Sequence, residues 1–375
     1  MRGKTIGIIG GGQLGRMLTL AAKPLGFDVV VINPSANSPA AQVGAQEIVA
    51  DLYDQKALEQ LSSMVDFLTV EIEHLDAEVL EKLSTKKSIN PAPATIRLIQ
   101  DKLEQKRFLA KHNIPIADFR SVTDQASAAK ALSDFGGKML LKARHGAYDG
   151  RGNRVVNSLK DIDAAFKVFD GRDLYAETYV PFVKELAVVV ARDLCGQTAT
   201  YPVVETIHQR NICLEVLSPA SIKPAQREQA EELATKVVNL LDGAGVFAIE
   251  MFLTVDGHIL VNEIAPRVHN SGHLTLEANR TSQFEQHVRA ITGLPLGNTE
   301  MIMPAAVMIN ILGEHDGPTK LTGIENALAN PDVSVHIYGK SPTKVDRKMG
   351  HLTAIGQTAK SARKKAREAR KLINV

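Results

Sequence analysis

The sequence contains no tryptophan and only two cysteines, Cys195 and Cys213, among its 375 residues. Two cysteines cannot build a disulfide framework, and such a low number is typical of proteins in a reducing compartment. No apolar run approaches the roughly 18 residues that a membrane-spanning helix requires. The first residues lead into an apolar strand at Thr5–Ile9 without a signal-peptide pattern. We therefore expect a cytoplasmic protein.

An excess of charge of either sign is also missing. The 44 Lys and Arg residues nearly balance the 42 Asp and Glu residues, which leaves a formal net charge of +2. Such a balance gives no electrostatic reason to expect a nucleic acid or a membrane as a partner. The length allows two or three domains with real cores. We therefore expect small-molecule substrates, no nucleic acid and no membrane.

The most informative stretch is residues 245–273, which begins with two strand-like segments joined by Asp256-Gly257. A two-residue Asp-Gly loop predicts a type I′ hairpin turn, because both central residues of that turn need a positive φ. In the resulting register Glu250 lies directly opposite Glu263. Two carboxylates in that arrangement repel each other. The pair therefore predicts a cation between them.

Carboxylate oxygens favour Mg²⁺, or Mn²⁺ in its place. The alternative is a solvated sheet face on which two glutamates repel weakly. Apolar flanks and the neighbouring Asn262 favour the metal site, and anion-binding and proton-handling side chains follow at once: Arg267, His269, Asn270, Ser271 and His273. A metal beside a cationic pocket indicates phosphate chemistry.

Residues 10–15 read Gly-Gly-Gly-Gln-Leu-Gly and directly follow the first strand. This pattern predicts a sharp turn into a helix over residues 13–25, with a backbone that can approach a phosphate at the helix N-terminus. The next strand, residues 28–32, ends in Asn33-Pro34, where a dinucleotide site requires an acidic side chain for the ribose. A nicotinamide dinucleotide is therefore disfavoured.

Three polar side chains, Glu71, Glu73 and His74, follow the strand predicted at residues 67–70. Open α/β sheets bind ligands at the carboxyl ends of their strands, so these side chains are candidates for a site. The alternative is that they cap the helix that follows, and the residues alone leave both interpretations open.

A charged helix predicted over residues 94–112 holds Lys102 and Lys106, for which a solvated helix face is the simpler explanation. A short strand near residues 138–143 carries Lys142 among apolar neighbours. It leads into a polar loop, residues 144–153, that contains three glycines. Such a loop has many free N–H donors and is suited to folding over phosphates, although a surface hairpin tip is the alternative.

Six motifs together resemble ATP-grasp enzymes, and more closely the N5-carboxyaminoimidazole ribonucleotide synthetase family of purine biosynthesis. They occur in the order typical of that family and span nearly the whole chain. The motifs are GGGQLGRM at 10–17, EIEH at 71–74, QDKLEQK at 100–106, GAYDGRGN at 146–153, NEIAPRVHNSGH at 262–273 and RKMGH at 347–351.

The resemblance implies an α/β protein (α+β overall) with an ATP-grasp fold. It implies an N-terminal Rossmann-like domain with a parallel sheet at residues 1–100. An ATP-grasp domain of two α+β lobes follows at 101–300, and a small β-rich C-terminal domain at 301–375 completes the substrate site. It also implies a homodimer.

The resemblance further implies which residues contact the two substrates. Glu250 and Glu263 would hold Mg²⁺ on the β- and γ-phosphates of ATP. The implied ATP-binding residues are Lys102, Lys142, Ala147, Tyr148, Asp149, Gly150, Arg151, Gly152, Asn153, Glu177, Thr178, Tyr179, Val180, Glu185, His208, Asn262 and Glu263. Those for the second substrate, 5-aminoimidazole ribonucleotide, are Gln13, Leu14, Glu73, Tyr148, Arg267, Arg347 and Lys348.

The implied reaction is carboxylation of 5-aminoimidazole ribonucleotide with ATP and bicarbonate, through carboxyphosphate. Lys142 and Arg267 would spread the charge of phosphoryl transfer, and His269 is the candidate general base. Direct attack on carboxyphosphate and attack on released CO₂ both remain open. The rival interpretations are another ATP-grasp ligase, such as a formate-dependent ribonucleotide transformylase, and a nucleotide-binding module without catalysis.

Overall fold

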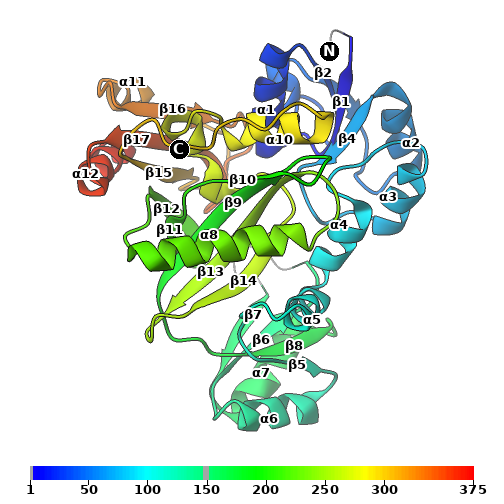
Figure 1. The fold of residues 1–375 in the computed structure, drawn as a ribbon, viewed down its shortest axis with the longest axis vertical. Helices are drawn as coiled ribbons and strands as arrows, with labels where there is room; N and C mark the ends of the chain where they lie inside the picture. Colours follow the sequence, from blue (N-terminus) through cyan, green and yellow to red (C-terminus); the bar gives the residue numbers. More distant parts are fainter. Residues whose placement is uncertain (1–2, 147–151) are drawn as a thin grey trace.

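The computed structural model describes residues 3–146 and 152–375, which form three sheets (Figure 1). The N-terminal sheet is parallel, as predicted, with the strand order β3-β2-β1-β4. Its strands are β1 (Thr5–Ile9), β2 (Asp28–Asn33), β3 (Gln46–Val49) and β4 (Phe67–Val70). The helices of this part are α1 (Gln13–Ala22), η1 (Lys23–Leu25), η2 (Ala41–Val43), α2 (Gln55–Met64), α3 (Ala77–Ser84) and α4 (Pro93–Gln100).

A nine-stranded sheet forms the centre of the molecule, in the order β14-β13-β9-β11-β12-β15-β17-β16 with β10 paired to β9. Its strands are β9 (Phe182–Arg192), β10 (Thr198–Thr200), β11 (Val204–Gln209), β12 (Ile212–Ser218), β13 (Gly245–Thr254), β14 (Ile259–Ala265), β15 (Ala305–Leu312), β16 (Val333–Ile337) and β17 (Lys348–Gly356). The helices of this part are α8 (Pro224–Asn239), η3 (Asn270–Gly272), α9 (Thr275–Ala278), α10 (Gln283–Thr292), α11 (Ile324–Ala327) and α12 (Ala359–Arg370).

This central sheet runs across residue 300, where we expect the C-terminal domain to begin. Strand β12 pairs with β15 on the other side of that boundary, with Ser218 opposite Ala306. The N-terminal part also packs on the central sheet, because Leu14 of α1 and Phe284 of α10 share one buried core with Val189 of β9. Residues far apart in the sequence thus meet at one place.

A smaller antiparallel sheet, β5-β8-β6-β7, forms a separate lobe at the bottom of Figure 1. Its strands are β5 (Phe119–Val122), β6 (Met139–Ala143), β7 (Asn153–Val156) and β8 (Leu174–Thr178), and helices α6 (Gln125–Asp134) and α7 (Leu159–Phe169) accompany it. The lobe has its own hydrophobic core, to which Leu141, Phe169 and Ala176 contribute.

The helix predicted over residues 94–112 is two helices, so that prediction was wrong at one residue. Asp101 adopts an extended conformation, with φ −95° and ψ 104°, and its side chain accepts hydrogen bonds from the backbone N–H groups of Leu103 and Glu104. This N-cap ends α4 and begins α5 (Lys102–Lys111). Lys102 therefore stands in the first turn of a helix rather than in the middle of one.

The hairpin β13–β14 places Glu250 opposite Glu263, as predicted, but by a different route. The loop holds three residues rather than two, because Thr254 N donates to His258 O, and Gly257 takes the positive φ of +90°. A register shift between Glu250 and Met251 then restores the predicted pairing. The type I′ turn was wrong, and a β-bulge that includes Asn262 compensates for it.

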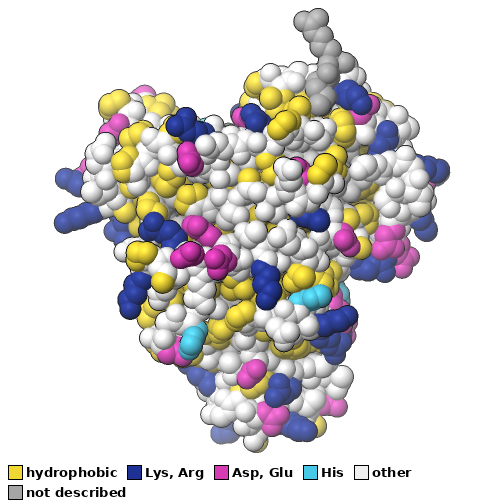
Figure 2. All heavy atoms as spheres, viewed as in Figure 1, with side chains coloured by type: hydrophobic (Ala, Val, Ile, Leu, Met, Phe, Trp, Pro, Cys, Tyr) yellow, Lys and Arg dark blue, Asp and Glu magenta, His cyan; other side chains and the backbone are white. Residues whose placement is uncertain are grey.

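Positive and negative side chains alternate over the face drawn in Figure 2, which fits the balanced composition. Within the described ranges, every helix is too short or too polar to cross a bilayer.

Candidate active site

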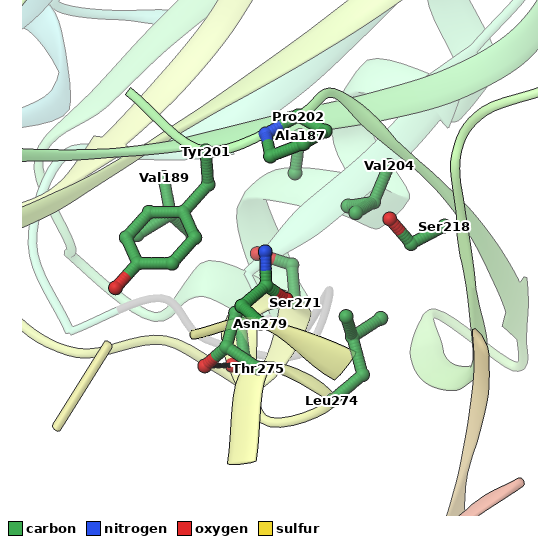
Figure 3. A pocket seen from close by; sticks show the side chains of 11 residues that line it. Ala187, Val189, Tyr201, Pro202, Val204, Ser218, Ser271, Leu274, Thr275 and Asn279 are labelled. Atoms are coloured by element: carbon green, nitrogen blue, oxygen red, sulfur yellow. Dashed lines mark hydrogen bonds between the residues drawn. The ribbon is translucent and has the colours of Figure 1, made fainter. Parts of the chain in front are cut away.

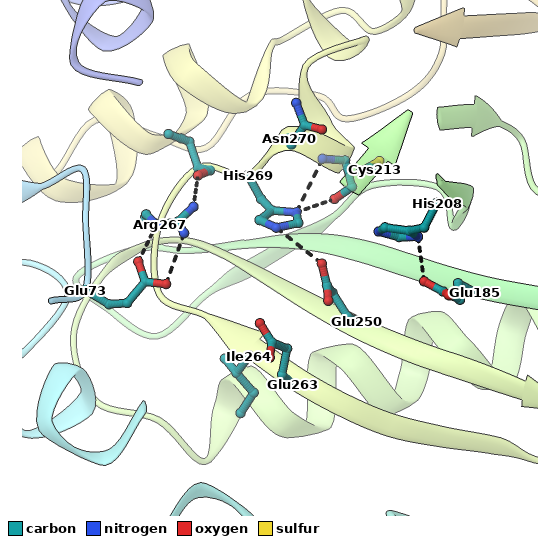
Figure 4. A network of polar contacts seen from close by, with 12 residues as sticks. Glu73, Glu185, His208, Cys213, Glu250, Glu263, Ile264, Arg267, His269 and Asn270 are labelled. Carbon is teal, nitrogen blue, oxygen red and sulfur yellow. Dashed lines mark hydrogen bonds and ion pairs between the residues drawn. The ribbon is translucent and has the colours of Figure 1, made fainter. Parts of the chain in front are cut away.

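The facing glutamates of β13 and β14 lie at the centre of a network of charged side chains (Figure 4). Glu250 Oε1 lies 3.3 Å from His269 Nε2, and Glu263 Oε2 lies 3.5 Å from Lys102 Nζ. Burial and the facing Glu263 carboxylate raise the pKa of Glu250 to about 7. The two carboxylates thus repel each other, as the sequence predicts.

These two side chains fit a divalent cation. They supply hard oxygen ligands at one place, and a cation between them would relieve the repulsion that raises the Glu250 pKa. In the described part of the chain, no group of three or more His, Cys, Asp or Glu residues forms a ready metal cage. Phosphate and water oxygens would therefore have to complete the coordination, which is typical of Mg²⁺ sites in phosphoryl transfer. Asn262 stands next to this pair, at the bulge.

Lys142 of β6 and Lys106 of α5 share one buried carboxylate, Glu177 of β8. Lys142 Nζ lies 2.5 Å from Glu177 Oε2, and Lys106 Nζ lies 2.5 Å from Glu177 Oε1. Burial disfavours the charge on Glu177, but Lys106 and Lys142 outweigh it and lower the pKa of Glu177 to about 2. In the same way the Glu177 carboxylate outweighs burial and raises the pKa of Lys142. Burial lowers the pKa of Lys106, and the Glu177 carboxylate opposes that shift.

Arg267 joins the central sheet to the N-terminal part of the chain. Its guanidinium binds Glu73 with two hydrogen bonds, Nε to Oε2 at 2.6 Å and Nη2 to Oε1 at 3.0 Å. Burial opposes charge on Glu73, but Arg267 lowers its pKa to about 2. Of the polar residues after β4, Glu73 thus meets Arg267, 194 positions away in the sequence, and its place in a ligand site stays a prediction.

His269 is held on several sides. Its Nδ1 lies 2.9 Å from Ser271 Oγ, and the Gln283 side chain bonds both its backbone N–H and its carbonyl. Burial, together with the charges of Arg267 and Lys348, lowers the pKa of His269 to about 3. The ring is therefore neutral at pH 7, and its weak basicity here argues for a role in positioning at least as much as for one in proton transfer.

His208 of β11 and Glu185 of β9 face each other, with Nδ1 2.6 Å from Oε2. Burial disfavours the imidazolium, but the hydrogen bond to Glu185 outweighs it and raises the His208 pKa. Glu250 and Lys348 also contribute to that pKa, which places His208 beside the glutamate pair.

Arg347 and Lys348 lie at the start of β17. Lys340, which the sequence did not single out, donates to Gln13 Oε1 and, at 2.9 Å, to the carbonyl of Lys348. Arg347 Nη1 donates to Pro342 O at 2.6 Å. The Gln13 and Lys348 segments thus come together as predicted, across more than 300 residues. The side chain of Leu14 packs in the core.

The glycine-rich turn at residues 10–15 gives two of its N–H groups to a carboxylate of the chain itself. Glu71 accepts hydrogen bonds from Gly12 N and Gly15 N, both at 2.5 Å. A Cβ on Gly10 would lie 2.2 Å from Glu71 Cγ. The glycines therefore make room for Glu71, and the approach of this turn to a phosphate stays a prediction.

The remaining predicted residues fall into three groups. Gly152 and Asn153 lie beside Lys142, since Ala143 N donates to Gly152 O and Asn153 pairs with Lys142. Thr178, Tyr179 and Val180 follow Glu177 at the end of β8 and beyond it. Ala147, Tyr148, Asp149, Gly150 and Arg151 lie outside the described residues.

A small cavity of about 10 Å³ lies behind the site, between β9 and residues 271–279 (Figure 3). Its volume corresponds to about one water molecule. Asn279 lines it, and the Oδ1 atom of this side chain is buried without a partner. The cavity is suited to a structural water rather than to a substrate.

Three residues that support the site escaped the sequence analysis in these roles: Glu71, Lys106 and Lys340. Glu71 and Lys106 belong to motifs that carry the resemblance, so the signal was present. Their partners, however, come from other parts of the chain, and only the fold reveals them.

The fold and the site together define an ATP-grasp ligase. The family description "ATP-grasp domain" matches residues 107–284, and "Ribonucleotide synthetase preATP-grasp domain" matches residues 3–100. "Phosphoribosylaminoimidazole carboxylase C-terminal domain" matches residues 306–365.

Within that class, the chain belongs to the N5-carboxyaminoimidazole ribonucleotide synthase family. The synthase of Brucella melitensis is 40% identical over 355 residues, which cover 94% of this chain and 96% of the relative. The Aspergillus clavatus synthase, solved in complex with ADP and 5-aminoimidazole ribonucleotide, superposes with a TM-score of 0.92, at 38% identity and 98% coverage of each chain.

The chain spans about two thirds of the length of a second group of relatives. The phosphoribosylaminoimidazole carboxylase of Ogataea methanolica is 46% identical over 369 residues, which are 96% of this chain but 67% of that protein. Similarity to this group therefore concerns only the matched part.

Proposed function

We propose that this protein carboxylates 5-aminoimidazole ribonucleotide on its exocyclic amine, with ATP and bicarbonate as co-substrates and ADP and phosphate as products. The observation that carries this proposal is the position of His269. It touches Glu250 of the proposed metal pair and lies within the electrostatic reach of Arg267 and Lys348. The proposed phosphate half and the proposed ribonucleotide half of the site would thus meet at one side chain.

ATP would lie between the small lobe and the central sheet. Lys102 and Lys142 would contact its phosphates, the backbone of residues 177–180 its adenine, and Glu185 its ribose hydroxyls. Glu250 and Glu263 would hold Mg²⁺ on the phosphates, where the cation neutralises charge that develops during phosphoryl transfer. Two contacts support this arrangement: Lys102 lies 3.5 Å from Glu263, and the Glu263 carboxylate also acts on Lys142.

In the first step a bicarbonate oxygen attacks the γ-phosphorus, and the bond to the ADP oxygen breaks. Lys142 and Arg267 would stabilise the charge on carboxyphosphate. In the second step the amine nitrogen bonds to the carboxyl carbon, either of carboxyphosphate or of CO₂ released from it. The bond between that carbon and the phosphate oxygen breaks, and the departing phosphate takes the proton that the amine loses. The 5′-phosphate of the ribonucleotide would bind Arg347 and Lys348 through charge-assisted hydrogen bonds. Glu73 would fix Arg267 during both steps.

The family resemblance alone supports three further proposals. These are a homodimer, a cytoplasmic location, and a division into domains at residues 1–100, 101–300 and 301–375. Size measurement in solution at several concentrations tests the first of them.

Measurement of ADP release with each acceptor tests the proposed reaction. We expect release to require both 5-aminoimidazole ribonucleotide and bicarbonate, and carbon from labelled bicarbonate to appear in the product. Equal activity with formate would favour a transformylase. ATP binding without turnover on any acceptor would favour a binding module.

A further inference from the structure

Lys106 is a buried cation to which neither the sequence analysis nor the proposed reaction gives a role. Its side chain is 2% exposed, against 13% for Lys142, and the Glu177 carboxylate that both contact is 3% exposed. Each lysine takes a different oxygen of that carboxylate. Lys106 lies on α5 and is almost fully buried, whereas Lys142 keeps a small exposed fraction.

The charges in this cluster do not cancel. Two buried lysines share one carboxylate, so the cluster has a net charge of +1 when both lysines are protonated. Burial lowers the pKa of Lys106, and the contact with Glu177 opposes that shift. Glu263 also acts on both lysines, but it is about two-fifths exposed and lies 3.5 Å from a third lysine, Lys102. A buried charge without compensation is costly. An unbalanced cation beside a cleft therefore points to an anion that arrives from outside.

We propose that Lys106 is a positioning residue, which neutralises Glu177 so that Lys142 keeps its charge available for an ATP phosphate. Without Lys106, the carboxylate and Lys142 would form a closed, neutral pair. An incoming phosphate would then have to break that pair. With Lys106 present, Glu177 stays satisfied when Lys142 turns to the nucleotide. This inference rests on the proposed ATP site.

Variants that change the net charge of the cluster separate this role from simple stabilisation. Lys106→Met makes the cluster neutral, and we expect the KM and Kd for ATP to rise about ten- to a hundred-fold, the range of a lost charge-assisted hydrogen bond. The KM for the ribonucleotide should change less than twofold. Lys106→Arg keeps the charge and should bind ATP nearly as the parent does.

The double variant Lys106→Met with Glu177→Gln is the decisive one. It removes the charges of Lys106 and Glu177 together and leaves that of Lys142, so the net charge of the cluster is again +1. The ATP affinity should therefore return to within about threefold of the parent value. Arg107→Met is the matched control, because Arg107 is the next residue of α5 and pairs only with Glu104, at 2.6 Å, among the ion pairs of the described chain. It should leave both KM values unchanged.

Calorimetry with Mg²⁺ and ATP, without the second substrate, measures the affinities, and thermal unfolding measures stability in parallel. A double variant that binds no better than Lys106→Met overturns the inference, as does an equal loss of affinity for both substrates. If Lys106→Met does not fold, the parent and the double variant are compared directly. A loss of more than tenfold then overturns the inference. If ATP binding follows the charge series but no carboxylated product forms, only the proposed reaction fails.

Discussion

Two groups of acidic side chains, Glu71 and the pair Glu250–Glu263, lie within the same network of charged residues but have opposite surroundings. Glu71 is 7% exposed and has its hydrogen bonds supplied by the chain itself, from Gly12 N and Gly15 N. Glu250 and Glu263 face each other instead, with Lys102 beside Glu263 and the neutral His269 ring beside Glu250. Because the chain itself supplies the partners of Glu71, we interpret Glu71 as structural. Because Glu250 and Glu263 face each other, we interpret them as ligands of a cation.

The glycines reflect the same difference. At Gly10 and Gly12 an added Cβ would come within 2.7 Å of a Glu71 side-chain atom, so the turn is shaped around a permanent occupant. The bulge next to Glu263 differs, since it brings the Glu263 carboxylate opposite a second carboxylate, Glu250.

The largest effect should follow from removing one member of the pair. Glu263→Gln keeps the size of the side chain but takes away a metal ligand, and kcat should fall by about a hundred- to a thousand-fold. Steady-state ADP release measures this. Glu205→Gln is the control, because Glu205 lies on the same sheet but pairs with Lys184 at 2.6 Å. If the Glu263→Gln enzyme keeps at least half of the parent kcat, Glu263 is not a metal ligand. The proposed difference between Glu263 and the structural residue Glu71 would then be wrong.

Substitution of Glu71 should have a smaller effect, and it should lower stability rather than kcat. Glu71→Gln replaces one acceptor oxygen with an amide that cannot accept from Gly12 or Gly15, and the free energy of unfolding should drop by about 2 kcal/mol. Denaturant unfolding gives the value. The folded variant should still bind ATP with nearly the parent affinity. Intact stability together with lost nucleotide binding would mean that Glu71 faces a ligand after all.

The smallest of these effects should appear at Lys348, at the edge of the site. Lys348→Ala removes a proposed phosphate contact and should weaken ribonucleotide binding by about 1.5 kcal/mol, seen as a rise in its KM. The KM for ATP should stay within twofold. Lys364→Ala, an exposed position of α12, serves as the control. An equal weakening of both substrates would contradict the proposed place of the ribonucleotide phosphate.

The hairpin shows how far the sequence could lead. Segments rich in apolar and β-branched residues, together with the Asp-Gly pair, predicted two strands and a facing glutamate pair, and both are present. The turn type was wrong, because only Gly257 needs a positive φ in a three-residue loop. The bulge at Asn262 could not be predicted, since an added residue in a strand leaves no local signal beyond one polar side chain out of phase.

The sequence could not predict contacts between distant segments, for a different reason. The pattern at residues 10–15 describes a backbone shape, and a phosphate and a carboxylate both fit that shape. Which of them occupies it depends on Glu71, about 60 residues later in the chain. Lys106 illustrates the same limit. A charged helix residue is usually solvated, and its burial becomes visible only once Glu177 is known to lie against it.

Thermal unfolding of the parent, Glu263→Gln and Glu71→Gln proteins, with and without Mg²⁺ and ATP, tests most directly whether Glu263 is a metal ligand and Glu71 a structural residue. Glu263→Gln should melt at the parent temperature or slightly above it without ligand, because a repulsion of up to ~1 kcal/mol is gone, and it should lose most of the stabilisation that Mg²⁺ and ATP give the parent. Glu71→Gln should melt lower without ligand but keep that stabilisation in full. A Glu263→Gln protein that is strongly destabilised without ligand, yet is stabilised by Mg²⁺ and ATP as much as the parent, would contradict the account.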